Sequence, residues 1–337
     1  ELSSQYSVRG GNFDENLVYV NDVEIYRPFL VRSGQQEGLS FVNSDLVSSV
    51  KFSAGGYDAR YGDNMSSALD ITYKRPRTFA GSSSLSLLGA SAHVEGASKT
   101  QRFTFLAGYR YKTTSYLLNT LETSGDYKPQ FSDLQTLLTY QLSRKLEISF
   151  LGNYSSNRYQ FIPRTRDTEF GTKDLPLNLR IYYEGQEVDQ FDTYLGALSL
   201  NYRPVKELSL KFTASAFRTS ERETYDILGQ YLINELDNTL GSDTYGDSIL
   251  NVGIGTLLTH ARNYLDAMVV SVSHLGSYQT DNSRLEWGVS YQFQDFYDQI
   301  SEWELIDSSG YVLPNDGNQI ILSDSRSNEN RTAYSQY

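Results

Sequence analysis

Apolar and polar residues alternate along most of the chain after about residue 80. In one clear segment, Phe103, Phe105, Ala107, Tyr109 and Tyr111 are separated by Thr104, Leu106, Gly108 and Arg110. Similar segments begin near Leu134, Leu146, Tyr194, Leu208 and Leu285. A period of two over roughly ten residues is typical of a β-strand with one apolar face. We therefore expect about nine antiparallel strands over residues 80–306 and a tenth that begins near Arg331.

The connections between these segments alternate between short and long. Short turns are expected at residues 98–101, 143–145, 203–207 and 280–284. Long loops are expected at 114–131, 157–190, 221–262 and 307–329, the third with a short helix at 231–237. Tight turns on one side and long loops on the other are typical of outer-membrane β-barrels, whereas compact soluble domains rarely carry several long loops.

This alternation of sides predicts two strands within residues 80–98. If the chain enters the sheet from the short-turn side, the turn at 98–101 lies on that side only when a hairpin precedes it. The turn of this hairpin is expected near residues 88–91, where Gly89 suits a tight turn. A single bent strand is the alternative.

One face of the strands is expected to contact lipid. Its predicted members are Phe103, Phe105, Tyr140, Ile148, Phe150, Leu198, Leu210, Phe212, Trp287 and Val289. Aromatic residues near strand ends suit the membrane interfaces. The alternative is aromatic packing across the strands of a soluble sheet.

Composition removes several classes of protein. The chain has 337 residues, 27 Tyr, 16 Phe, no Cys and a net charge of −12. It has no apolar run of the length that a membrane-spanning helix needs. Without cysteine there are no disulfides or thiolate metal sites, and the acidic balance argues against nucleic acid as a partner.

No chemistry of catalysis is predicted. His93, His260 and His274 lie far apart and lack metal-ligand spacing. The carboxylates of residues 221–247 are interpreted as a solvated face, and no catalytic or phosphate-binding motif is found. We expect no enzyme, no metal and no cofactor.

The first part of the chain follows a different pattern. Residues 7–76 contain short apolar strands around an Asn-Asp turn, a capped short helix near residue 45, and several glycines. Its distinctive motif residues are Arg9, Gly10, Gly11, Asn21, Asp22, Gly55, Gly56, Arg60, Tyr61 and Gly62. We expect a small mixed domain in which the glycines serve backbone geometry and not ligand contact.

This succession resembles the second half of the plug domain of TonB-dependent outer-membrane receptors. The resemblance implies an all-β transmembrane fold: residues 1–78 as a mixed α/β plug inside the lumen, and residues 79–337 as the first part of an antiparallel barrel of about 22 strands. It also implies that the chain is partial, with the segment that contacts TonB and about a dozen strands outside it. Polar contacts between plug and barrel are expected to involve Arg102, Gln135, Glu147, Asn153 and Asn201.

The resemblance implies TonB-dependent import of a scarce nutrient across the bacterial outer membrane. The nutrient is a metal chelate or another small solute or oligomer, bound between the plug apex and the long loops. The expected partners are TonB, membrane lipid and this substrate. The turn Tyr19-Val20-Asn21-Asp22-Val23 departs from that of glycan importers that pair with a surface lipoprotein. This departure argues against a glycan substrate and a lipoprotein lid without excluding either. A non-transporting scaffold of the same fold and a passive porin are the alternatives.

Four residues are predicted to contribute to substrate binding: Arg27, Phe29, Arg32 and Gln35. They lie in a segment whose apolar and basic residues are poorly explained by packing, and the corresponding plug loop of the resembled family faces the outside. The basic residues would favour an anionic substrate, or they would pair with carboxylates of the barrel wall.

Overall fold

The computed structural model describes residues 6–11, 15–26, 40–56, 60–61, 66–113, 115, 125–307 and 319–336. Its first part forms a sheet of four strands, here called the small sheet. They are β1 (Asn16–Val20), β2 (Val23–Glu24), β3 (Val47–Ser53) and β4 (Ser67–Tyr73), in the order β2-β1-β4-β3. Strand β1 runs parallel to β4, and the other pairs are antiparallel. A short 3₁₀ turn, η2 (Ser44–Leu46), is capped by the Asn43 side chain.

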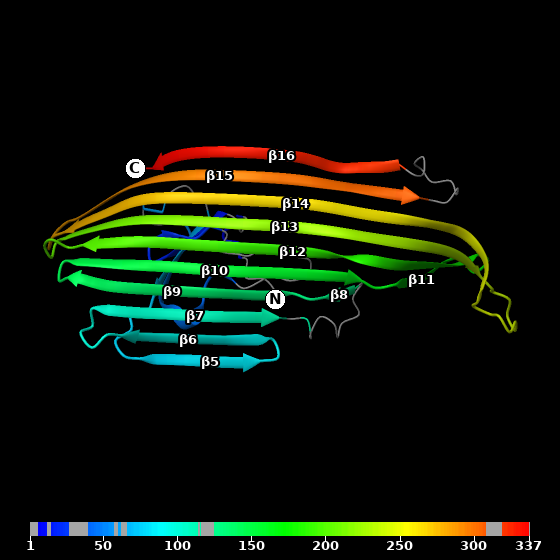
Figure 1. Cartoon of the computed structure of the whole chain (residues 1–337), viewed down its shortest axis with the longest axis horizontal. Helices are drawn as coiled ribbons and strands as arrows, with labels where there is room; N and C mark the ends of the chain where they lie inside the picture. The colour runs from blue at the N-terminus through cyan, green and yellow to red at the C-terminus, as the bar shows by residue number, and fades with distance from the viewer. Residues whose placement is uncertain are drawn as a thin grey trace.

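The rest of the chain forms one large antiparallel sheet, with β16 and β5 at the ends of its strand order. The strands are β5 (Ala80–Ser86), β6 (Gly89–Ala97), β7 (Phe103–Thr113), β9 (Gln130–Ser143), β10 (Leu146–Pro163), β12 (Pro176–Tyr202), β13 (Leu208–Leu236), β14 (Ser248–Gln279), β15 (Arg284–Asp307) and β16 (Gln319–Gln336). Two short strands, β8 (Gly125–Tyr127) and β11 (Arg166–Gly171), pair with β10 and β12. The small sheet lies behind the large one in Figure 1.

The short turns occur where the sequence predicts them. Residues 98–102, 144–145, 203–207 and 280–283 connect consecutive long strands. The hairpin within residues 80–98 is also confirmed, with β5 and β6 joined at residues 87–88 and Gly89 at φ 147°. The four short turns lie at the same end of the strands, the left side of Figure 1, and the β5–β6 hairpin turns at the opposite end.

The prediction of long loops, in contrast, is largely wrong. Most of residues 157–190 and 221–262 is strand, and the helix expected at 231–237 is the end of β13 and the start of a turn. The β13–β14 ladder runs from Leu208 opposite Tyr278 to Leu236 opposite Ser248. Backbone pairing continues because each strand has a neighbour, even where the apolar alternation fades. Strand β16 likewise begins at Gln319, earlier than the expected start near Arg331.

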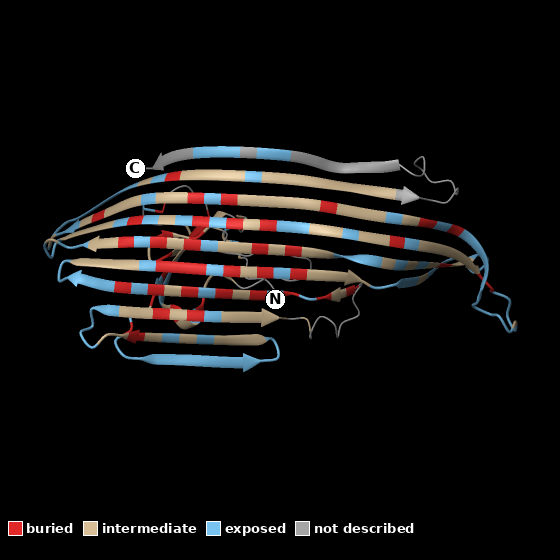
Figure 2. Ribbon diagram, viewed as in Figure 1, coloured by how far each residue is buried: buried red, intermediate tan, exposed pale blue. Residues whose placement is uncertain are grey.

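The predicted outward face is confirmed as a solvent-accessible face of the sheet. Phe103, Tyr140, Phe150, Leu198, Phe212, Trp287 and Val289 are exposed, and Phe105, Ile148 and Leu210 are partly exposed. The residues between them point to the other face, so buried and exposed positions alternate along the strands in Figure 2. This face is not the interior of a two-sheet sandwich.

The small sheet packs against the inner face of the large sheet through an apolar core. Val18, Val20, Leu46, Ile71 and Tyr73 of the small sheet belong to this core. The large sheet contributes Leu106, Leu137, Leu151, Leu195, Ala197, Phe217 and Val269. The expectation that polar contacts hold the two parts together is therefore incomplete, because the inner positions opposite the small sheet carry apolar side chains.

Within the described part of the chain, no helix has both the length and the apolar character needed to cross a membrane.

Candidate functional site

A largely buried arginine joins the large sheet to the segment just before η2. Arg110 on β7 donates hydrogen bonds to the carboxylate of Asp133 on β9 at 2.8 and 2.5 Å. It also donates to the backbone carbonyl oxygens of Ser40 and Val42, at 2.8 Å each. The side chains of Arg110 and Asp133 are only 14% and 4% exposed. Such charge-assisted bonds are about twice as strong as neutral ones, and one arginine fixes both the strand pair and the segment before η2.

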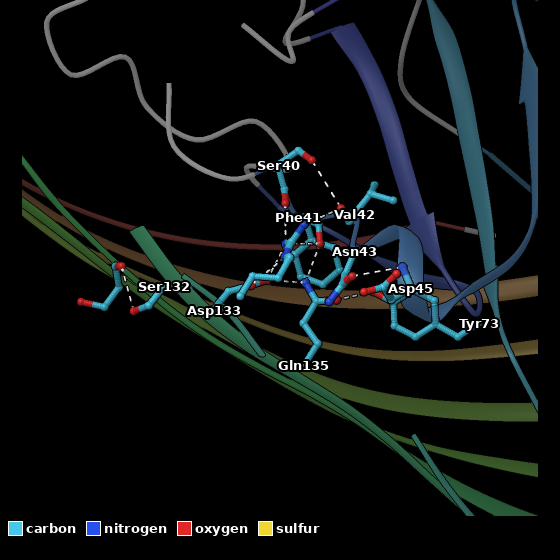
Figure 3. Close-up of polar contacts among 11 residues, drawn as sticks. Ser40, Phe41, Val42, Asn43, Asp45, Tyr73, Ser132, Asp133 and Gln135 are labelled. Carbon is cyan, nitrogen blue, oxygen red and sulfur yellow. Dashed lines mark hydrogen bonds and ion pairs between the residues drawn. The ribbon is translucent and has the colours of Figure 1, made fainter. Parts of the chain in front are cut away.

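Gln135 extends this network toward β4 (Figure 3). Its side-chain nitrogen donates to the Phe41 carbonyl oxygen at 2.5 Å and to Asp133 at 2.9 Å. Its oxygen accepts a hydrogen bond from the Tyr73 hydroxyl at 2.6 Å. Burial raises the pKa of Tyr73, so the hydroxyl stays protonated and can act as this donor. Every polar atom of the Gln135 amide is thus directed at a named partner.

A second polar contact holds the turn between β1 and β2. Asn21 and Asp22 have φ of 51° and 64°, a left-handed conformation that Asn and Asp tolerate better than most residues. The ammonium group of Lys211 on β13 donates to the Asn21 carbonyl oxygen and to the Asp22 carboxylate, both at 2.6 Å. Arg60 lies 3.6 Å from the other Asp22 oxygen. The turn therefore presents two acceptors to one cation of the large sheet.

A pocket lies between these contacts, at the junction of the two sheets. Its enclosed space is small: the centre of a water molecule can occupy about 20 Å³ of it, which is room for about one water. Its lining consists of Ile25, Tyr26, Ser40, Phe41, Asp133, Asn153, Ser155, Asn157, Thr193, Leu195 and Phe217. The rings of Tyr26 and Phe217 lie 5.5 Å apart. The segments after β2 and before η2 thus supply one side of the pocket, and the inner face of β9, β10, β12 and β13 supplies the other.

A family comparison identifies the small sheet. Residues 1–68 match the family model for the TonB-dependent receptor plug domain. The first part of the chain is therefore a TonB-dependent receptor plug domain. The small sheet with the segments that flank its strands is accordingly called the plug, and the large sheet is called the barrel wall.

Three solved structures are similar to the chain. One is the siderophore receptor PirA from Pseudomonas aeruginosa, with 12% identity, a TM-score of 0.34, and coverage of 97% of this chain and 75% of that one. Another is the ferripyoverdine receptor of the outer membrane of Pseudomonas aeruginosa, with 10% identity, a TM-score of 0.34, and coverage of 89% and 51%. The ferric yersiniabactin uptake receptor FyuA from Yersinia pestis shows 11% identity, a TM-score of 0.37, and coverage of 99% and 55%. The chain thus spans about half the length of the last two. No curated protein sequence matches the chain.

The four residues predicted to bind substrate, Arg27, Phe29, Arg32 and Gln35, lie outside the described residues, as does Gly62. The described residues that flank this segment, Tyr26 and Ser40, line the pocket. Among the motif glycines, Gly10, Gly55 and Gly56 have positive φ values of 81°, 80° and 62°.

Only some of the polar residues that were expected to contact the plug from the barrel wall do so. Gln135 bonds the plug directly, and Glu147 accepts two hydrogen bonds of 2.9 Å from Arg75, just after β4. Asn201 bonds Glu147 at 3.4 Å, and Asn153 lines the pocket. Arg102, in contrast, is exposed in the turn before β7.

Sequence reasoning missed Arg110, Asp133 and Lys211, which make or support charged contacts with the plug. The sequence did contain a sign of Arg110. The other residues at its positions in the alternation, Thr104, Leu106 and Gly108, carry no charge, whereas Arg110 does. A charge on the inner face of a barrel strand indicates a partner inside the lumen.

Lys211 is expected to hold the plug turn in place. Substitution Lys211→Met should weaken plug docking by about 1–3 kcal/mol, because Asp22 and the Asn21 carbonyl lose a charged donor. Hydrogen exchange of the amides in β1 and β2, measured on the detergent-solubilised full receptor, should accelerate. Lys206→Met, in an exposed turn, is the control. Equal exchange in both variants would contradict this role.

Carboxylates crowd the inner wall farther from the short turns. Glu223 on β13 lies directly opposite Asp189 and diagonal to Glu187 on β12. Burial raises the pKa of Glu187, and the charge of Glu223 raises it further.

Substitution Glu187→Gln should therefore stabilise the receptor by about 0.2–1 kcal/mol at neutral pH. A raised folded-state pKa means that the ionised form destabilises the native state above it. The gain should decline as the pH falls through that raised value and vanish below about 4.3, where the unfolded chain is also protonated. Thermal unfolding in detergent between pH 4 and 8 measures this, with outward-facing Glu184→Gln as the control. A gain that does not change with pH would contradict the charge repulsion.

Proposed function

We propose that the receptor containing this chain imports a scarce solute across the outer membrane by a TonB-dependent mechanism. The supporting observation is a plug domain docked on the inner face of a barrel wall, with a pocket at their junction. In this proposal the solute binds between the plug and the inner face of the wall, toward the end of the strands opposite the short turns. TonB then displaces the plug and opens the path.

The contacts at the junction suit a plug that is held firmly and can still be released. Apolar burial gives most of the docking energy, and it does not depend on direction. The Arg110 and Lys211 contacts fix the orientation of the plug, because hydrogen bonds require defined geometry. A passive porin needs neither feature.

Uptake measurements on cells that produce the full receptor test this proposal. The probes are radiolabelled ferric citrate, ferrichrome, cobalamin and maltohexaose, each supplied at limiting concentration. We expect import of at least one probe in cells with functional TonB and background import in cells without it. Equal import in both strains would support a passive channel, and binding without import in both would support a scaffold.

A further inference from the structure

We propose that two arginines on the outward face of the wall, Arg158 of β10 and Arg222 of β13, bind the headgroup phosphates of an anionic membrane lipid. These two residues are here called the arginine pair. The inference rests on the outer-membrane placement that the proposed function requires, and it concerns the face of the wall opposite the plug. It needs neither the imported solute nor TonB.

The register of the strands places the arginine pair side by side. Arg158 lies opposite Gln190 of β12, and Gln190 in turn lies opposite Arg222. Gln190 continues the outward row of Leu198 and Tyr194, because the residues of a strand alternate between its two faces. Residues that lie directly opposite on paired strands share a face, so both arginines also point outward. Neighbouring strands are about 4.8 Å apart, which separates the two arginine backbones by roughly 10 Å.

Neither member of the arginine pair is engaged within the described part of the chain. Both residues are exposed, and the guanidinium group of neither makes an ion pair or a hydrogen bond there. Other outward arginines differ, since Arg218 lies 3.6 Å from Asp266 and Arg262 pairs with Asp226. A guanidinium group presents a planar fork of N–H donors that matches the oxygens of a phosphate group. The pair therefore offers two such forks on one surface.

The arginine pair lies just outside the apolar band of the wall. On β10 the outward residues Phe150 and Tyr154 are followed by Ser156 and then Arg158. The rings of Tyr154 and Tyr194 lie 5.0 Å apart, and such aromatic residues mark the edge of the hydrocarbon layer. Four residues of a strand tilted by about 35–45° raise Arg158 roughly 10 Å above Tyr154. The headgroup layer is roughly 5–8 Å thick on each side, and a long arginine side chain can reach back into it.

Charge complementarity favours an anionic partner on this face. Within the described strands, the outward row that contains the pair holds no carboxylate. Its other members are Thr113, Gln130, Gln190, Tyr264, Gln299 and Ser327. Asp192, at the next outward position toward the apolar band, accepts a hydrogen bond from Gln190 at 2.7 Å. On the inner face, in contrast, Asp189 and Glu223 lie opposite each other. An anionic lipid surface attracts cations that point toward it.

A lipid suits this position better than a free anion. Its acyl chains would cover the apolar row that begins at Tyr154, while its phosphates would accept charge-assisted hydrogen bonds from the pair. A free phosphate would gain only the second contribution, which salt screens at an exposed site. The separation of the two arginines suits a headgroup that carries more than one phosphate.

Native mass spectrometry of the full receptor in detergent tests the inference. The probes are diphosphoryl lipid A and phosphatidylcholine, with millimolar inorganic phosphate as a competitor. We expect lipid A to bind at least tenfold more tightly than phosphatidylcholine and to stay bound in the presence of phosphate. Equal binding of the two lipids, or full displacement of lipid A by phosphate, would overturn the inference.

The double variant Arg158→Gln/Arg222→Gln tests the residues. It should abolish the preference for lipid A and leave the thermal unfolding temperature unchanged, because both side chains are exposed and unengaged. Gln190→Glu keeps both arginines but places a carboxylate between them, and it should also weaken the binding of lipid A.

The matched control is Arg144→Gln/Lys206→Gln, which removes the same charge from exposed short turns at the other end of the strands. It should keep the preference for lipid A. An equal loss of lipid A in both double variants would reduce the effect to net charge and overturn the site, as would unchanged binding in Arg158→Gln/Arg222→Gln.

Uptake measurements separate failure of this inference from failure of the proposed function. TonB-dependent import by a receptor that shows no preference for lipid A would remove the lipid site and leave active uptake intact. A preference for lipid A that depends on the arginine pair, in a receptor whose import does not depend on TonB, would keep the lipid site and remove active uptake.

Discussion

Truncation of Leu46 to alanine should weaken the docking of the plug by about 2–5 kcal/mol. Leu46 is fully buried in the core shared by plug and wall. It lies over Gly108 on β7, where an added Cβ would come within 3.1 Å of the Leu46 side chain. The wall therefore approaches closely at a glycine, and leucine fills the space above it. Loss of this side chain leaves a cavity that the paired strands of the wall cannot close.

Hydrogen exchange and proteolysis of the full receptor in detergent measure this effect. Amides of β3 and β4 should exchange faster in Leu46→Ala, while those of β12 and β13 in the wall should not change. Val50→Ala on β3 is the matched control, because Val50 is 53% exposed. If both variants behave alike, the shared core does not hold the plug.

The alternation of apolar and polar residues was sufficient to predict most of the wall. Phe103, Leu198 and Trp287 face outward as the period of two requires. This prediction succeeded because side chains of a strand alternate between its faces whatever the neighbouring strands do. The short turns were also predictable, because they interrupt the alternation with charged and small residues.

The ends of the strands and the contacts across the lumen were less accessible to sequence reasoning. Beyond residue 220 of β13 apolar and polar residues are mixed on both faces, with Ile227 and Ile233 on one face and Leu232 on the other. Hydrophobic alternation therefore no longer distinguishes a paired strand from a loop. The bond between Lys211 and Asp22 joins residues far apart in sequence, and no local pattern specifies it. The pocket depends on the same long-range packing, since its lining comes from the plug and from four strands of the wall.

The outward face of β12 provides the second prediction with a large effect. Tyr202, Leu200, Leu198, Gly196 and Tyr194 form its outward row, and Asp192 follows. At about 3.4 Å per residue this row extends roughly 27 Å along the strand. Strands of such barrels tilt by about 35–45°, so the row spans roughly 20 Å of membrane, close to the apolar band of outer-membrane barrels. Leu198 lies at its centre and is 49% exposed.

Substitution Leu198→Arg should therefore destabilise the receptor by about 2–4 kcal/mol in lipid, because the guanidinium would enter the middle of the hydrocarbon layer. Glu184→Arg lies on the same face of the same strand but beyond the apolar row, and it should cost no more than about 1 kcal/mol. Equilibrium unfolding of the full receptor in lipid vesicles with guanidinium chloride measures both variants. In detergent micelles, which thin and deform around a charge more readily, the difference between them should shrink. Equal stability of the two variants in vesicles would mean that this face of β12 does not contact the membrane interior.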